Sequence, residues 1–102
     1  MEERKTRPSK LTLRVMTPKG IAFEGGCDSI VLPLANDKNG ERGGAIGIRP
    51  GHARAVLALS GGKIIARAGG ETLAVAEIDG GLASVENDIV SVITDNARIE
   101  EA

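Results

Sequence analysis

The sequence predicts an all-β fold, and three observations carry that prediction. Short segments rich in valine, isoleucine, leucine and threonine recur along the chain. Ten of the 14 glycines form five Gly-Gly pairs between these segments, and paired glycines favour tight turns because they adopt positive φ at little steric cost. No segment places apolar residues at a helical spacing. Short strands divided by turn residues indicate a β-sandwich or a β-barrel, and the residues alone leave both open.

Residues 11–16 give the clearest strand. Leu11, Leu13 and Val15 point to one face, and the residues between them point to the other, as in a half-buried strand. A turn with proline in its second position and glycine in its fourth follows directly. By the same reasoning we expect further strands at residues 21–24, 29–34, 46–49, 54–59, 63–67, 72–77, 82–85 and 89–94.

The remaining segments set the boundaries of a single domain. Pro33 indicates an edge strand or a bulge at its position, because proline has no N–H to donate to a neighbouring strand. Residues 35–45 are polar and glycine-rich and predict a surface loop. The polar residues 95–102 are expected to fray or to begin a helix. The predicted organisation is therefore a flexible arm at 1–10, a β-sandwich domain at 11–97 and a tail at 98–102.

Composition excludes several classes of protein. The formal net charge is −1, whereas a nucleic-acid-binding domain needs a basic face, so no nucleic acid is expected as a partner. The single cysteine, Cys27, cannot form an internal disulfide and fits a reducing compartment as a small, partly buried apolar side chain. The apolar runs are too short to span a bilayer, and the charged N-terminus does not resemble a signal peptide, so we expect a soluble protein without membrane insertion.

The sequence offers little material for catalysis. One histidine and one cysteine are too few for a typical zinc site, and we expect no metal, no cofactor and no catalytic residue. Residues 60–63 (Ser-Gly-Gly-Lys) lack the first glycine and the final serine or threonine of a phosphate-binding loop, so a hairpin turn is the better interpretation. Two carboxylates that meet only in the folded chain would escape this reasoning, which leaves a small hydrolase open as an alternative.

The most informative stretch is a rigid turn followed by the only histidine. Pro50 fixes one φ angle and Gly51 permits the bend that follows it. His52 comes next, and an imidazole can both donate and accept a hydrogen bond. Two interpretations of His52 remain open: its side chain stabilises its own turn, or it contacts a partner at an interface.

The same stretch carries a resemblance to a known family. Ile30-Val31-Leu32-Pro33, a variable loop and then Gly47-Ile48-Arg49-Pro50-Gly51-His52-Ala53 resemble the epsilon subunit of bacterial F-type ATP synthases, the delta subunit of mitochondria. The resemblance also includes Leu13-Arg14-Val15-Met16-Thr17-Pro18, the segment from Gly20 to Gly25, Ile78-Asp79-Gly80-Gly81-Leu82 and residues 89–97. It covers residues 11–97, nearly all of the predicted folded part.

The resemblance implies a ten-stranded antiparallel β-sandwich that catalyses nothing. It implies a place in the central stalk, where the family binds the gamma subunit and the ring of c subunits and couples ion translocation to ATP synthesis. The chain would then lie on the cytoplasmic face of the bacterial inner membrane, within the peripheral F1 sector. By resemblance, the gamma interface would include Ile48, Pro50, Gly51, His52 and Ala53, and the loop facing the c ring would include Asp37, Lys38, Asn39, Glu41, Arg42 and Ala45.

Two departures from the family pattern stand out. The loop 35–45 is several residues longer than usual, and Ala45 occupies a position that is often acidic, so Glu41 and Arg42 are candidates to replace that acid. Residues 1–102 also lack the two-helix C-terminal domain that usually follows the sandwich, and we expect neither inhibition nor ATP binding from them. The alternative to a stalk subunit is a free-standing β-sandwich adaptor or ligand-binding module, whose binding element would be the loop 35–45.

Overall fold

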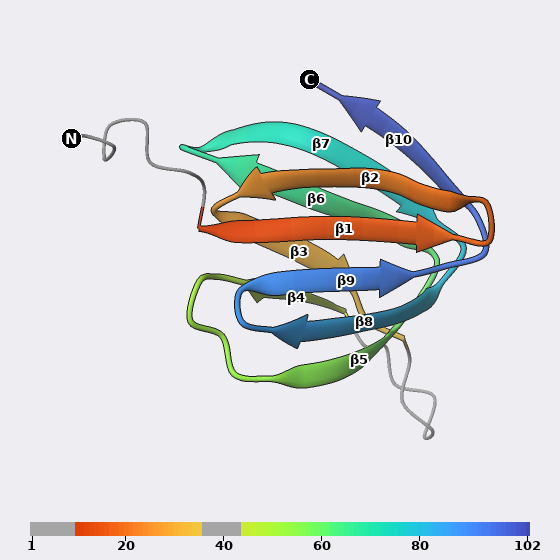
Figure 1. Ribbon diagram of the computed structural model, residues 1–102, viewed down its shortest axis with the longest axis horizontal. Coiled ribbons are helices and arrows are strands. Elements are labelled where there is room, and N and C mark those ends of the chain that lie inside the picture. The colour runs from red at the N-terminus through yellow and green to blue at the C-terminus, as the bar shows by residue number, and fades with distance from the viewer. Residues whose placement is uncertain (1–9, 36–43) are drawn as a thin grey trace.

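The computed structural model describes residues 10–35 and 44–102, and these residues form strands joined by turns. Figure 1 shows the ten strands in chain order. The part of the chain that the structure describes holds no helix of the length and apolarity needed to cross a bilayer. The strands are β1 (Leu11–Thr17), β2 (Gly20–Cys27), β3 (Ser29–Pro33), β4 (Ala45–Ile48), β5 (Ala55–Leu59), β6 (Gly62–Ala68), β7 (Glu71–Ile78), β8 (Gly81–Glu86), β9 (Ile89–Ile93) and β10 (Ala97–Glu101).

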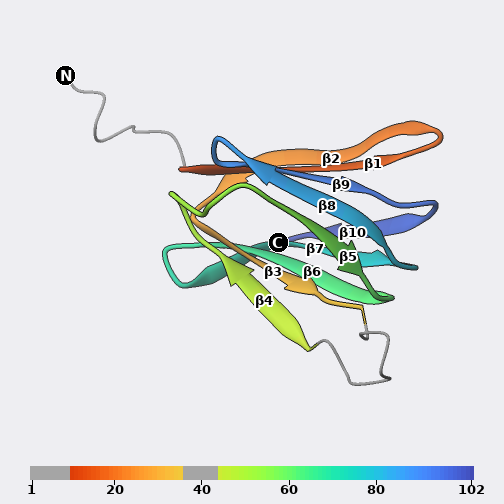
Figure 2. The same ribbon diagram turned by 90° about the horizontal axis from the view of Figure 1, so that it is seen from below.

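The ten strands form two five-stranded sheets packed face to face, which confirms the predicted β-sandwich. Sheet A has the order β2-β1-β9-β8-β5, and sheet B has the order β10-β7-β6-β3-β4. Figure 2 shows the two layers from the side. All pairs are antiparallel except β1 and β9, which run parallel. The parallel pair joins the first hairpin to the last strand of sheet A, a contact between distant segments that no local pattern encodes.

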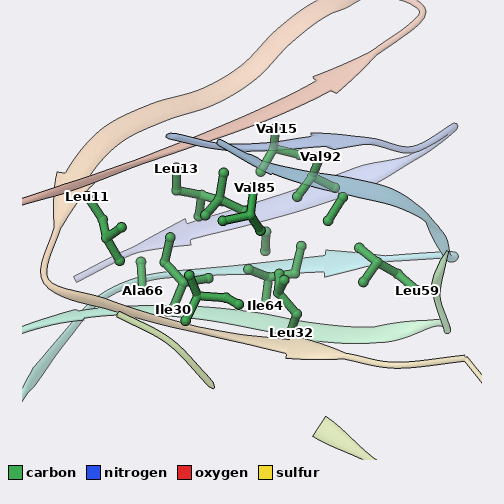
Figure 3. Packing of buried hydrophobic residues seen from close by; sticks show 14 of the residues in the cluster. Leu11, Leu13, Val15, Ile30, Leu32, Leu59, Ile64, Ala66, Val85 and Val92 are labelled. Atoms are coloured by element: carbon green, nitrogen blue, oxygen red, sulfur yellow. The ribbon is translucent and has the colours of Figure 1, made fainter. Parts of the chain in front are cut away.

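An aliphatic core fills the space between the sheets, and Figure 3 shows its packing. Leu11, Leu13 and Val15 are buried on the inner face of β1, as their alternation predicts. Burying a side chain of this kind contributes about 1.5–3 kcal/mol relative to leaving it exposed. The only aromatic residue, Phe23, is half-buried and packs against the edge of this cluster. Other members of the core come from both sheets: Ile30, Leu32, Ile48, Leu59, Ile64, Ala66, Ala76, Ile78, Ala83, Val85, Val90 and Val92.

The pair Gly25-Gly26, which the sequence suggests as a turn, instead lies within β2. Gly25 pairs with Leu13 and Gly26 with Thr12 across the β1–β2 ladder. A Cβ atom on Gly25 would lie 2.9 Å from Cζ of Phe23, so the missing side chain makes room for the aromatic ring. The prediction fails here because a glycine in a strand serves close packing as readily as it serves a turn.

For Pro33 the sequence predicts an edge strand or a bulge. β3 is not an edge strand of the sheet, because it lies between β6 and β4, and its register with β4 shows no bulge. Pro33 is the last residue of β3 and pairs with Ala45 of β4. The pairing of β3 with β6 has already ended at Val31. Proline is tolerated at this position because no β6 carbonyl remains for the missing N–H to bond.

The polar C-terminal residues form a strand and neither fray nor begin a helix. β10 pairs with β7 in antiparallel register, and Ile99 packs against the core. The N–H of Ala102 continues the ladder by donating to the Leu73 carbonyl at 2.8 Å. The predicted tail at 98–102 is therefore largely part of sheet B. Apart from Lys10, the predicted arm at 1–10 lies outside the described residues.

Candidate interface surfaces

The turn that precedes His52 forms as the sequence predicts. Arg49, Pro50, Gly51 and His52 make a four-residue β-turn, closed by a hydrogen bond of 3.2 Å from the His52 N–H to the Arg49 carbonyl. Gly51 has a φ of 85°, which identifies the turn as type II and explains the glycine. Both central residues of the turn are exposed, so this tip can contact a partner.

A second hairpin fixes the position of this turn. The carboxylate Oδ1 of Asp88 accepts a hydrogen bond of 2.8 Å from the Gly51 N–H. Asp88 lies in the turn between β8 and β9, and its carbonyl accepts a hydrogen bond from the N–H of Thr12 in β1. The turn is therefore tied through one residue to the β8–β9 hairpin and to β1.

His52 braces the segment that follows it. Its Nδ1 lies 2.7 Å from the Ala53 carbonyl oxygen, and a carbonyl only accepts, so Nδ1 carries the proton. In the tautomer with the proton on Nδ1, the Nε2 atom can accept a hydrogen bond. The geometry supports the bracing interpretation and leaves Nε2 available to a donor on a partner.

The described residues among those predicted by resemblance lie at or beyond the two ends of β4, and thus toward opposite ends of the sandwich. We call the end with Pro50, Gly51, His52 and Ala53 the turn end. Ala45 is exposed at the other end, which we call the loop end, and β4 connects the two. Five residues predicted to face the c ring lie outside the described residues: Asp37, Lys38, Asn39, Glu41 and Arg42.

One predicted interface residue, Ile48, offers no surface. Its side chain is fully buried in the core between the sheets. It follows that Ile48 supports the turn end from inside and does not present an apolar contact to a partner. The sequence could not predict the burial of Ile48, because residues 46–49 are too few to show which face of the strand is turned inward.

The residues next to the described ends of the loop are hydrogen-bonded to each other and, on one side, to β5. The Leu34 N–H donates to the Gly44 carbonyl at 2.8 Å, and the Ala35 N–H donates to the Ala58 carbonyl at 3.0 Å. The second of these bonds connects the end of β3, in sheet B, to β5 at the edge of sheet A. A load applied at the loop end would therefore be shared by both sheets.

The outer face of sheet A carries an apolar surface that sequence reasoning missed. Strand register places five residues side by side across all five strands, and we call them the apolar row: Ile21, Met16, Ile93, Leu82 and Ala58. Ile21, Ile93 and Leu82 are 59%, 60% and 52% exposed. Val56 stands two residues from Ala58 on β5 and is 73% exposed. Figure 1 shows these strands in the order β2, β1, β9, β8 and β5.

The signal for this surface was present in the sequence. Residues 55–59 are all apolar, and in residues 89–93 every side chain except that of Ser91 is apolar. Alternate residues of a strand point to opposite faces, so only every second side chain faces the core. The side chains between them then expose apolar groups. Contiguous exposed apolar residues on a small protein mark an interaction surface.

The described residues hold neither a cluster of metal ligands nor a reactive cysteine. Within residues 10–35 and 44–102, no three His, Cys, Asp or Glu side chains gather closely enough to hold a metal ion. Cys27 is fully buried, more deeply than the sequence suggests. Burial raises the pKa of its thiol from 9.0 to about 11, and the negative charge of Asp28 adds to the increase. The thiol is therefore held in its unreactive protonated form.

Comparison with known proteins agrees with the fold. Residues 10–100 match the family described as ATP synthase, delta/epsilon chain, β-sandwich domain. The ATP synthase epsilon chain of Synechococcus sp. (strain CC9311) is 35% identical over 89 residues, which are 87% of this chain and 60% of that protein. The epsilon chain of Prochlorococcus marinus (strain MIT 9313) is 38% identical over 87% of this chain and 61% of its own length. The chain thus spans about 60% of the length of these curated relatives.

Solved structures share the architecture. A chain in the mitochondrial ATP synthase of Euglena gracilis, a structure of OSCP, F1 and c-ring, superposes with a TM-score of 0.73 at 21% identity, over 90% of this chain and 54% of that one. A chain in the central stalk and c-ring structure from Tetrahymena thermophila gives 0.65 at 12% identity, over 89% and 67%. The family match over residues 10–100 includes all ten strands except the last residue of β10. This chain therefore belongs to the delta/epsilon family of ATP synthase chains and comprises its β-sandwich domain.

Proposed function

We propose that this chain is a non-catalytic rotor component of an F-type ATP synthase, which docks on the gamma subunit and contacts the c ring. The observation that carries the proposal is the apolar row on the outer face of sheet A. A free protein of this size gains nothing from three isoleucine and leucine side chains that are more than half exposed in one line. A permanent partner that covers these side chains would remove them from water and so offset the unfavourable free energy of their exposure.

The gamma subunit is the occupant we assign to this face. Relatives over most of the chain are named ATP synthase epsilon chain, and the structural neighbours come from ATP synthase assemblies described as F1, central stalk and c-ring. The turn end supplies a second contact through Pro50, Gly51, His52 and Ala53. The loop end, with Ala45 and the residues 37–42, would face the c ring. The complex would lie on the cytoplasmic face of the bacterial inner membrane.

The fold suits a part that transmits torque. Both sheets close on one aliphatic core, and the bond from Ala35 to Ala58 joins the sheets at the loop end. Such a body resists shear because its backbone hydrogen bonds and its packed core would have to break together. Coupling of ion flow to ATP synthesis would then depend on stiffness and on surface contacts.

Affinity for gamma tests the proposal. Val56→Asp and Leu82→Asp place a charge on the proposed docking face and leave the core untouched. We expect each to reduce binding of purified gamma by about tenfold or more, since a desolvated carboxylate in an apolar interface costs at least about 1.4 kcal/mol. The matched control is Leu73→Asp, because Leu73 is a partly exposed leucine on sheet B. Equal losses in all three variants, or no loss in any, would contradict the assignment.

The c-ring contact needs its own test. A Glu41→Cys variant in the assembled enzyme would be treated with a thiol cross-linker and probed for adducts with c subunits. The native Cys27 does not interfere, because it is buried and its pKa is about 11. Adducts are the expected result, and their absence would remove the loop from the proposed contact.

A further inference from the structure

A hollow at the turn end collects three positively charged side chains. Lys10 precedes β1, Arg49 follows β4, and Arg67 lies on β6, so the cations come from three separate segments. Together they line a depression of about 480 Å³, which we call the basic hollow. All three residues are exposed. The chain as a whole carries a net charge of −1, so this concentration of positive charge is local.

The cations of the basic hollow lack partners within the described part of the chain. The ion pairs seen there involve other arginines: Arg14 with Glu24, Arg54 with Glu86 and Arg98 with Glu77. Among the described residues that line the hollow, the acid is Asp28. Its Oδ2 accepts a hydrogen bond of 2.9 Å from the Gly69 N–H, so this carboxylate is engaged by the backbone. Counted over the described residues that line it, three cations and one acid, the hollow has an excess of two positive charges.

The arrangement suits carboxylates that arrive on a polypeptide. Arg67 and Ser29 are cross-strand partners, so the guanidinium and the hydroxyl leave the same face of sheet B side by side. A guanidinium binds a carboxylate through two parallel hydrogen bonds, and a neighbouring hydroxyl can donate a third. Lys10 and Arg49 offer further positions for a second acidic side chain. A hollow of this volume accommodates more than one such group.

A compact phosphate dianion fits the same place less well. Asp28 contributes a negative charge to the wall, which repels a concentrated double charge more strongly than separated carboxylates. The nearby Gly69 amide, which could have served as a phosphate donor, already bonds Asp28. Phosphate sites rely heavily on free backbone N–H groups of this kind. The observations thus favour a protein ligand.

We propose that the basic hollow binds an acidic segment of a protein partner, with two or more carboxylates seated against Lys10, Arg49 and Arg67. The contact is electrostatic, so it orients the partner at the turn end and accelerates association more than it adds affinity. It is independent of the apolar row, which lies on the outer face of the other sheet. The basic hollow goes beyond the proposed function because its partner need not be gamma.

Binding of a hexaglutamate peptide to the full, isotope-labelled chain tests the proposal. We expect titration at low salt to shift the backbone amide signals of Arg49, Ser29 and Gly70, and the affinity to fall when salt is added. The double variant Arg49→Glu/Arg67→Glu should lower the affinity by about tenfold or more, since it replaces two attractions with two repulsions. The control Lys19→Glu/Lys63→Glu makes the same change in net charge on exposed residues elsewhere and should bind as the wild type does.

Each other result overturns the proposal. An equal loss in both double variants would show that only net charge matters. Signals that shift away from the turn end would place the peptide elsewhere. Inorganic phosphate that displaces the peptide at a comparable concentration would identify a small-anion site. If the glutamate variants fail to fold, Arg49→Gln/Arg67→Gln replaces them, with a smaller expected loss of about threefold or more, because it removes two attractions and adds no repulsion. Because gamma is absent from the experiment, its outcome leaves the test of the apolar row untouched.

Discussion

Asp88 holds the tip of the turn end through Gly51: its Oδ1 accepts the Gly51 N–H at 2.8 Å while its own backbone has a φ of 63°. Asn87 before it has a φ of 54°, so the two residues form the tight turn of the β8–β9 hairpin. Glycine is the common residue at the second position of such a turn. Aspartate tolerates the positive φ, and here it gains the bond to Gly51 in return.

Substitution of Asp88 separates these two effects. Asp88→Gly relieves the backbone and removes only the carboxylate bond, so we expect the free energy of unfolding to change by at most about 1 kcal/mol. Asp88→Ala loses the bond and keeps the strained φ, and it should cost about 1–3 kcal/mol. Urea unfolding measures both. If alanine proves as stable as glycine, the positive φ carries no cost at this position.

A side chain at Gly81 should be poorly tolerated. Gly81 has a φ of 146°, and a Cβ atom there would collide with the carbonyl oxygen of Ile93 on the neighbouring strand. We expect Gly81→Ala to lower the free energy of unfolding by about 2–4 kcal/mol, because the obstacle is backbone and cannot move aside. Gly47→Ala is the control, since Gly47 has open space around it. Thermal unfolding of the pair should show a marked difference, and similar melting temperatures would refute the collision.

The two roles open to His52 can be told apart by isosteric replacement. We expect His52→Ala to weaken gamma binding more than it weakens folding. Asparagine places its amide nitrogen where Nδ1 bonds the Ala53 carbonyl, whereas glutamine reaches the position of Nε2. Binding retained by His52→Asn would identify the brace, and binding retained by His52→Gln would identify a contact through Nε2. Equal losses of melting temperature and affinity in His52→Ala would favour a brace alone.

The buried thiol of Cys27 should make the folded chain lose stability as the pH rises into the alkaline range. Its pKa is about 11 in the folded chain and 9.0 without the protein environment, because burial, aided by Asp28, disfavours the thiolate. The unfolded chain therefore releases this proton first as pH rises. The stabilisation is complete below pH 9 and is lost between pH 9 and about 11, to a total of about 2–3 kcal/mol.

Comparison with a Cys27→Ala variant isolates this contribution from other groups that titrate in the same range. The difference in free energy of unfolding between wild type and variant should be constant up to about pH 9 and should shrink above it. A difference that stays constant to about pH 11 would show that the thiol titrates alike in both states. Labelling of the native chain by a thiol reagent at neutral pH should also be slow.

Local patterns predicted most of the sandwich. Alternation in residues 11–16 identified the inner face of β1, and the turn at Pro50 and Gly51 formed as its residues require. Predictions failed where a residue serves a distant neighbour: Gly25 accommodates the ring of Phe23, and the parallel pairing of β1 with β9 joins segments far apart in sequence. β10 was missed because its two inward residues, Ala97 and Ile99, are too few to show a period.

The candidate site was harder to predict than the fold, for a physical reason. A motif such as the turn before His52 is contiguous, so a sequence can reveal it. The apolar row takes one residue from each of five strands, and only the register brings Ile21 beside Met16 and Ile93 beside Leu82. The same holds for the basic hollow, whose cations come from three segments.

Cross-linking from the outer face of sheet A tests the central claim most directly. A photoactivatable reagent would be attached to a Val56→Cys variant, and to Leu73→Cys as the control on the opposite sheet, with each variant assembled into the enzyme complex. The buried native Cys27 should remain unlabelled. Irradiation should join Val56→Cys to the gamma subunit and leave Leu73→Cys without a gamma adduct. Gamma adducts from Leu73→Cys alone, or from neither variant, would contradict the proposal that sheet A carries the docking face.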